Sequence, residues 1–76
     1  MTSLYASIIR TSKGDVFTEI QMARDYLENV LLIRGHLEDS DTEVMEVHMC
    51  AVAEVIDEPT EEQMAAAESW IKGHLK

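Results

Sequence analysis

The chain has 76 residues, of which 46% are hydrophobic and only 5% aromatic, and its formal net charge at pH 7 is −9. A chain this short makes one domain, and it buries only about 60% of the surface that its unfolded form exposes. The excess of carboxylates argues against binding to nucleic acid or to anionic membranes, because both need lysine and arginine to neutralise phosphates. We therefore expect a neutral or basic partner.

The cysteine content and the amino-terminal residues predict where the protein works. Cys50 is the single cysteine, whereas small secreted domains depend on several disulfides. Residues 1–10 lack a basic region followed by a long apolar stretch, so they do not resemble a signal peptide. The longest strongly apolar run, Val30 to Ile33, is far shorter than the roughly 20 residues of a membrane span. We expect a cytoplasmic protein.

The first predicted element covers residues 1–14, and its type is open between helix and strand. Leu4, Ile8 and Ile9 match helical spacing, yet Ile8 and Ile9 also favour a strand. We prefer the helix. A turn at residues 12–15 ends this element in either interpretation.

Three capping-box patterns follow, each a Ser or Thr with Glu or Gln three residues later. They are Thr18 with Gln21, Ser40 with Glu43, and Thr60 with Gln63. Each pattern satisfies two backbone N–H groups that the start of a helix leaves unpaired. They predict helices at about residues 19–37, 41–57 and 61–73, with Pro59 separating the second from the third.

The apolar residues of these segments recur at helical spacing. The first predicted stripe consists of Ile20, Ala23, Leu27, Val30 and Leu31, which leaves Asp25, Glu28 and Asn29 to face water. The second carries Val44, His48, Ala51 and Val55 on one row, with Met45, Met49, Val52 and Ile56 beside it, and the third carries Met64, Ala67 and Ile71, with Trp70 at its margin. The predicted fold class is all-α: a small three-helix bundle with an additional amino-terminal short helix or strand.

Residues with catalytic or metal-binding chemistry are few and lack the usual spacings. The three histidines, His36, His48 and His74, fit no zinc-binding pattern, and no acidic loop fits a calcium site. On a helix His48 and Cys50 would not face each other, because residues two apart point in different directions. The sequence predicts no enzyme activity, no metal and no cofactor.

Acidic residues dominate the middle of the chain, where no lysine or arginine occurs between Arg34 and Lys72. The acidic strip that we predict to bind a partner consists of Glu38, Asp39, Asp41, Glu43, Glu46, Glu54, Asp57, Glu58, Glu61 and Glu62. Such a surface fits a groove built for nucleic acid, with carboxylates in place of phosphates. The alternative is a solvated face that only maintains solubility.

The apolar residues exceed what three short helices bury, which predicts a homodimer. The expected core or dimer seam consists of Val44, Met45, His48, Met49, Val52, Val55, Ile56 and Trp70. Two hypotheses follow. In the first, the acidic strip docks on a basic, nucleic-acid-binding protein; in the second, the apolar second helix is the working surface of a homodimeric assembly module.

In its size and charge, the chain is similar to small inhibitors that phages and plasmids encode against host nucleic-acid machinery, including anti-CRISPR proteins. This resemblance implies a stoichiometric inhibitor or regulator that mimics nucleic acid on the surface of its target. It covers no aligned motif, so it assigns no further residues.

Overall fold

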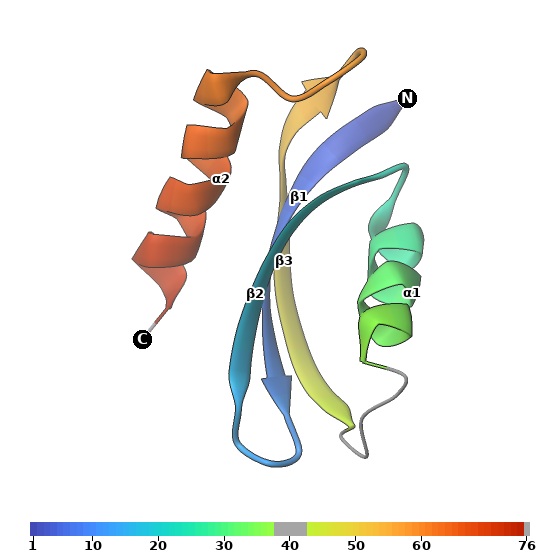
Figure 1. Cartoon of the computed structure of the whole chain (residues 1–76), viewed down its shortest axis with the longest axis vertical. Helices are drawn as coiled ribbons and strands as arrows, with labels where there is room; N and C mark the ends of the chain where they lie inside the picture. Colours follow the sequence, from blue (N-terminus) through green and yellow to red (C-terminus); the bar gives the residue numbers. More distant parts are fainter. Residues whose placement is uncertain (38–42, 76) are drawn as a thin grey trace.

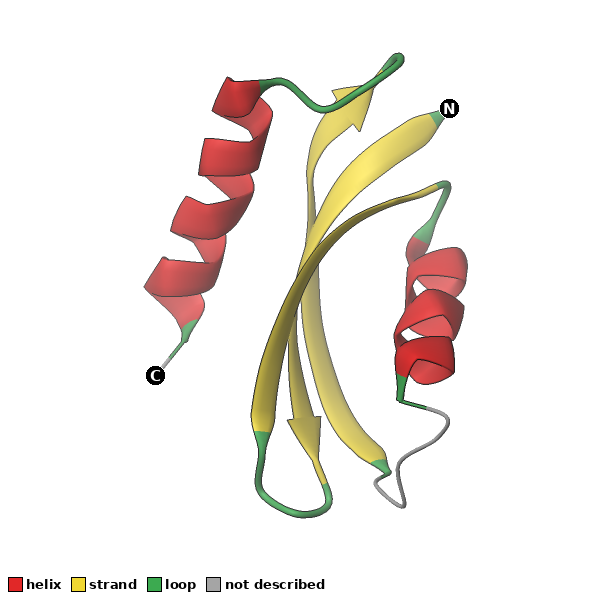
Figure 2. Cartoon of the chain, in the orientation of Figure 1, coloured by secondary structure: helices red, strands yellow, loops and turns green. Residues whose placement is uncertain are grey.

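The computed structural model describes residues 1–37 and 43–75, which form three strands and two helices. In chain order these are β1 (Thr2–Thr11), β2 (Val16–Ala23), α1 (Tyr26–His36), β3 (Val44–Val55) and α2 (Glu61–His74). The chain therefore has an α+β fold (Figure 2), and the prediction of an all-α helical bundle is wrong.

The three strands form one antiparallel sheet in the order β2-β1-β3. Figure 1 shows this sheet between α2 on one side and α1 on the other. The central strand β1 is therefore covered on both faces, and residues 4–9 are all buried. A strand covered on both faces needs a continuous run of apolar or small residues, without the alternation of a half-exposed strand. The preference for a helix at residues 1–14 is wrong for this reason.

The larger apolar core lies between the sheet and α2. Leu4, Ala6 and Ile8 point to this face of β1, because side chains two apart in a strand share a face. They pack with Ala67 and Ile71 of α2, while Val55, Ile20, Val52, Met64 and Trp70 complete the cluster. Burial of Leu4 and of Ile8 contributes about 1.5–3 kcal/mol each.

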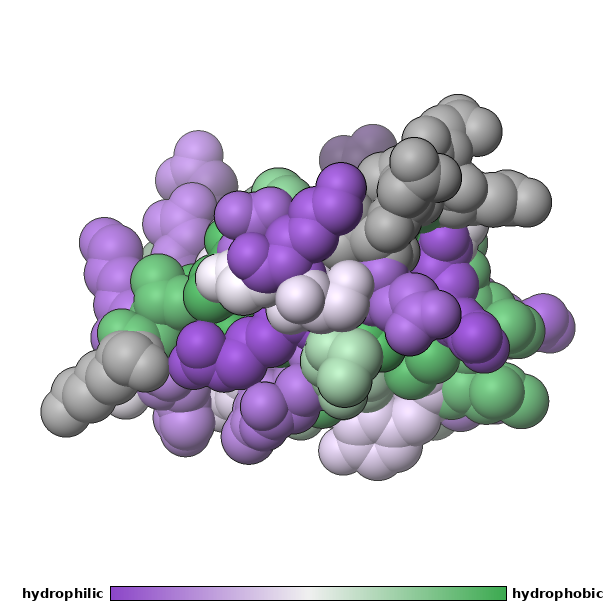
Figure 3. Space-filling view, turned by 90° about the horizontal axis from the view of Figure 1, so that it is seen from below, coloured by the Kyte–Doolittle hydropathy of each residue, from purple (hydrophilic) through white to green (hydrophobic). Residues whose placement is uncertain are grey.

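The layer on the α1 side is smaller and partly polar. Ile33 and Asn29 are fully buried there, and Tyr5 contacts Tyr26 edge to face at a ring distance of 5.5 Å. Most other apolar residues of α1 remain exposed: Tyr26 by 58%, Leu27 by 68%, Leu31 by 56% and Leu32 by 38%. Figure 3 shows apolar side chains at the surface on the side where α1 lies. The predicted stripe is therefore wrong at Leu27 and Leu31, and Asn29 does not face water.

The third predicted helix start is confirmed. Thr60 and Gln63 form both hydrogen bonds of a capping box, and α2 begins at Glu61. The first predicted start is wrong, because residues 18–21 belong to β2; α1 begins after Asp25, whose side chain accepts a hydrogen bond from the backbone N–H of Glu28.

The second predicted helix, at residues 41–57, is also wrong. Ser40 of its capping box lies outside the described residues, but the chain from Val44 to Val55 is the strand β3. The pairing of β3 with β1 shifts register twice, so β3 holds an extra residue at Met45 and at Val52. An extra residue changes the spacing of residues on one face from two to three, as between Val44 and Val47 and between Cys50 and Ala53, and this spacing resembles that of a helix.

Candidate functional site

Five of the predicted acidic residues lie together where β3 leads into α2, at the top of Figure 1. We call this group the acidic turn surface: Glu54 near the end of β3, Asp57 and Glu58 in the turn, and Glu61 and Glu62 in the first turn of α2. All five residues are exposed. Local chain geometry therefore concentrates half of the predicted acidic strip at one end of the molecule.

Hydrogen bonds of Gln63 hold this turn in place. Its side-chain oxygen accepts from the backbone N–H of Thr60 at 2.9 Å, and its backbone N–H donates to Thr60 Oγ1 at 3.1 Å. Its Nε2 donates to the backbone carbonyl of Glu54 at 3.0 Å, which ties the start of α2 to the end of β3. The carboxylates are thus carried by an ordered turn rather than by a free loop.

An apolar residue lies among these carboxylates. Ile56 is 97% exposed, the highest value among the exposed large hydrophobic residues. It borders an open depression of about 300 Å³, which is also lined by Glu54, Asp57, Glu58, Thr60 and Gln63. An exposed apolar side chain next to a ring of charges is the arrangement that protein interfaces use, with an apolar centre and a polar rim.

No lysine or arginine among the described residues forms an ion pair with the acidic turn surface. Ion pairs join Arg24 to Glu28, His36 to Glu19 and His48 to Glu46, and these residues lie outside the acidic turn surface. The positive end of the α2 dipole favours Glu61 and Glu62, which are in its first turn. The carboxylates still repel one another, and a cationic partner would reduce this repulsion.

Of the other predicted acids, Glu43 and Glu46 do not continue this surface. Glu43 precedes β3 and Glu46 lies near its beginning, so the length of the strand separates both from the acidic turn surface. Glu46 contacts the ring of His48. Glu38, Asp39 and Asp41 lie outside the described residues. The acids thus do not form one continuous strip along a helix.

The predicted apolar seam is divided in the same way, because its residues lie on a strand instead of a helix. Val55 is buried in the α2-side core, and Val52 and Trp70 pack against that core. Met45, His48 and Ile56 are exposed, while Val44 and Met49 are half-buried. Only part of the seam is available to a partner.

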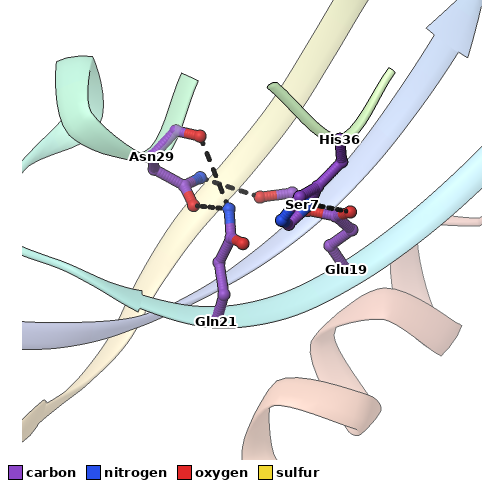
Figure 4. Close-up of polar contacts among 5 residues, drawn as sticks. All are labelled: Ser7, Glu19, Gln21, Asn29 and His36. Carbon is purple, nitrogen blue, oxygen red and sulfur yellow. Dashed lines mark hydrogen bonds and ion pairs between the residues drawn. The ribbon is translucent and has the colours of Figure 1, made fainter. Parts of the chain in front are cut away.

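A buried polar network beneath α1 was missed from the sequence (Figure 4). Asn29 Nδ2 donates to Ser7 Oγ at 2.9 Å, and Gln21 Nε2 donates to Asn29 Oδ1 at 2.7 Å. Ser7 and Asn29 are fully buried. The network joins α1 to β1 and β2, and the sequence offered no signal that set Asn29 apart from the exposed polar residues of the same helix.

A second polar contact anchors the end of α1 to β2. His36 Nδ1 lies 2.7 Å from Glu19 Oε1, and Glu19 Oε2 is buried without a hydrogen-bond partner in the described part of the chain. Glu19 is opposite Ser7 across the strands, so both contacts belong to the α1 side of the sheet. In Figure 4 the two groups of side chains lie next to each other.

Neither contact assembles a reactive site. The hydroxyl of Ser7 is fully buried and accepts its hydrogen bond from Asn29, so it has no access to a substrate. No cluster of three or more His, Cys, Asp or Glu residues suited to a metal ion occurs within residues 1–37 and 43–75. The spacing argument about His48 and Cys50 changes, because on a strand residues two apart share a face, but His48 is already paired with Glu46.

No described helix combines the length and the apolar character needed to cross a membrane. No family model, curated protein or solved structure matches the chain.

Proposed function

We propose that this chain is a small acidic protein-binding regulator or inhibitor, and not an enzyme, that docks its acidic turn surface on a basic, nucleic-acid-binding protein. The observation that carries the proposal is the grouping of five exposed carboxylates at one turn, three of which line a depression with the exposed Ile56, without a basic partner among the described residues.

The carboxylates supply the recognition. A planar guanidinium binds a carboxylate or a phosphate through two parallel hydrogen bonds, so a groove that binds phosphates also accepts a row of carboxylates. The hydrogen bonds of Gln63 hold the turn in place before binding, which reduces the entropy that docking costs. Charge complementarity speeds the encounter and makes binding weaken as salt is added.

Ile56 supplies an apolar anchor at the centre of this contact. Burying such a side chain fully contributes about 1.5–3 kcal/mol, and the surrounding carboxylates form the polar rim. The proposal places the protein in the cytoplasm, where the unpaired thiol of Cys50 and the nucleic-acid-binding targets coexist.

The test is an affinity purification with mass spectrometry that compares the unchanged protein with two variants of equal charge. One variant carries Asp57→Asn, Glu58→Gln, Glu61→Gln and Glu62→Gln in the acidic turn surface. The control carries Asp15→Asn, Asp25→Asn, Glu43→Gln and Glu68→Gln at exposed positions elsewhere. We expect partners that bind the unchanged protein and the control, are lost from the first variant, and are released by heparin as a competing polyanion.

Ile56→Ser tests the apolar anchor and should weaken the same binding about tenfold or more. Equal capture by both four-residue variants, or partners that resist heparin and salt, would rule out the electrostatic docking.

A further inference from the structure

The outer edge of β3 is open. In the described chain β3 pairs with β1 on one side only and forms the border of the sheet. Between its two register shifts, Glu46–Ala51 pair regularly with β1. The backbone N–H and C=O groups that point outward from this segment form a template for another strand.

β3 has extra residues at Met45 and Val52, and such bulges protect an edge, but the segment Glu46–Ala51 between them pairs regularly. The twelve residues of β3 contain no lysine, arginine or proline, which are other ways to block an edge. The other border strand, β2, carries an inward-pointing charge at Glu19, which His36 binds. An inward-pointing charge near an edge is one way in which proteins prevent pairing, so β3 is the more open edge.

We propose that a second copy of this chain occupies this edge, with the two β3 strands antiparallel about a two-fold axis at Val47, so that the two sheets join into one of six strands. This inference does not depend on the acidic turn surface.

The side chains of β3 select this register. With Val47 opposite its counterpart, Glu46 lies opposite the partner's His48, whose ring accepts the same contact with a carboxylate that it makes within one chain. The two Val47 side chains form an apolar pair at the axis, and such pairs across strands stabilise a sheet. A two-fold axis at Cys50 would instead place Glu46 opposite the partner's Glu54, where the like charges repel.

The antiparallel arrangement also keeps the acidic turn surfaces of the two copies far apart. Glu54 is seven residues from Val47, so at about 3.3 Å per residue it lies roughly 23 Å from the axis. The acidic turn surfaces of the two copies are then roughly 45 Å apart, several times the screening length of about 8 Å at physiological ionic strength. The carboxylates of the acidic turn surface therefore do not oppose this pairing.

A cysteine placed at the two-fold axis provides a direct test. In the proposed register Val47 lies opposite its counterpart, at a Cα separation of about 4.5–5.5 Å, which suits a disulfide. Val47→Cys combined with Cys50→Ser should therefore give a disulfide-linked dimer on mild oxidation, seen by non-reducing gel electrophoresis. The unchanged protein should not cross-link, because its two Cys50 residues would be six positions, or roughly 20 Å, apart. Efficient cross-linking of the unchanged protein would reject this register.

A charge exchange tests the same register without a disulfide. Light scattering after gel filtration should find a dimer for the unchanged protein and a monomer for His48→Glu, in which the introduced carboxylate would meet the partner's Glu46. Adding Glu46→His to this variant should restore the dimer. Leu31→Glu, on the exposed face of α1, is the control and should leave the dimer intact. A monomeric unchanged protein at submillimolar concentration, or a dimer that Leu31→Glu dissociates and His48→Glu does not, would overturn the proposal.

Discussion

The side chain of Asn29 donates a hydrogen bond of 2.9 Å to Ser7, and both residues are fully buried between α1 and the sheet. Gln21 Nε2 donates to Asn29 Oδ1, so removing the amide leaves the buried Ser7 Oγ without this donor and leaves Gln21 only its longer hydrogen bond of 3.4 Å to the backbone carbonyl of residue 29. We expect Asn29→Ala to lower the free energy of unfolding by about 2–3 kcal/mol, measured by urea denaturation followed by circular dichroism.

A double-mutant cycle separates the hydrogen bond from general packing. Ser7→Ala should cost less than Asn29→Ala, since it leaves the amide its contact with Gln21. The two changes should be coupled by about 0.5–3 kcal/mol, as residues in one network are. Strictly additive effects would show that the hydrogen bond between Asn29 and Ser7 does not stabilise the fold.

The start of α2 is stabilised by the side chains of Thr60 and Gln63. Thr60→Ala removes the side-chain oxygen that accepts from Gln63 N, and we expect a loss of about 1 kcal/mol in the free energy of unfolding. Thr60→Ser keeps an acceptor at the same position and should restore most of the loss. A loss as large in Thr60→Ser as in Thr60→Ala would assign the effect to the methyl group and not to the cap.

The start of α2 was predictable because every signal for it is local. Thr60 and Gln63 act within one turn of chain, and the structure uses both as expected. Pro59 was expected to separate two helices, but it follows the strand β3 instead. The same local pattern at Thr18 and Gln21 failed, because Gln21 binds Asn29 across layers instead of capping a helix. A capping box therefore predicts a helix only where its residues are not already paired in a sheet or hydrogen-bonded to another element.

Whether the segments of β1 and β3 form helices or strands depends on tertiary contacts, which a local sequence pattern does not contain. β1 is covered on both faces, which removes the alternation that marks a strand. The two extra residues of β3, Met45 and Val52, shift its alternation to the spacing of a helix. For the candidate site, the acidic residues of the turn were identified from charge alone, but their separation from Glu43 and Glu46 follows from an extended β3.

Burial of Tyr5 predicts sensitivity of the fold to high pH. Loss of solvation, and next the charges of Tyr26 and Asp25, raise the pKa of Tyr5 above its ordinary value of 10.0. The unfolded chain therefore loses this proton first as pH rises. The stabilisation from neutral Tyr5 is complete below pH 10 and is lost as pH rises from there through the pKa of the folded state.

The variant Tyr26→Phe isolates this ionisation, because Tyr5 is then the one tyrosine left. We expect its phenolate absorbance to appear at higher pH in the folded protein than in concentrated urea. In Tyr5→Phe the loss of stability above pH 10 should be reduced. Equal titration midpoints in the folded and unfolded states of Tyr26→Phe would contradict the effect of burial.

Three glycines separate the effect of backbone conformation from that of packing. Gly14 has a φ of 83° in the turn between β1 and β2, whereas Gly35 and Gly73 lie in helices, and an added Cβ would meet no atom within 4 Å at any of them. Alanine at Gly35 or Gly73 should raise the free energy of unfolding by about 0.5–1 kcal/mol, because it restricts the unfolded chain and favours the helix. Gly14→Ala should lower it by about 1–2 kcal/mol, since an alanine strains at positive φ. Urea denaturation should thus show a loss of stability in Gly14→Ala and a gain in the other two variants. No new contact forms in any of them. A stabilised Gly14→Ala would therefore mean that this turn adopts a different backbone conformation.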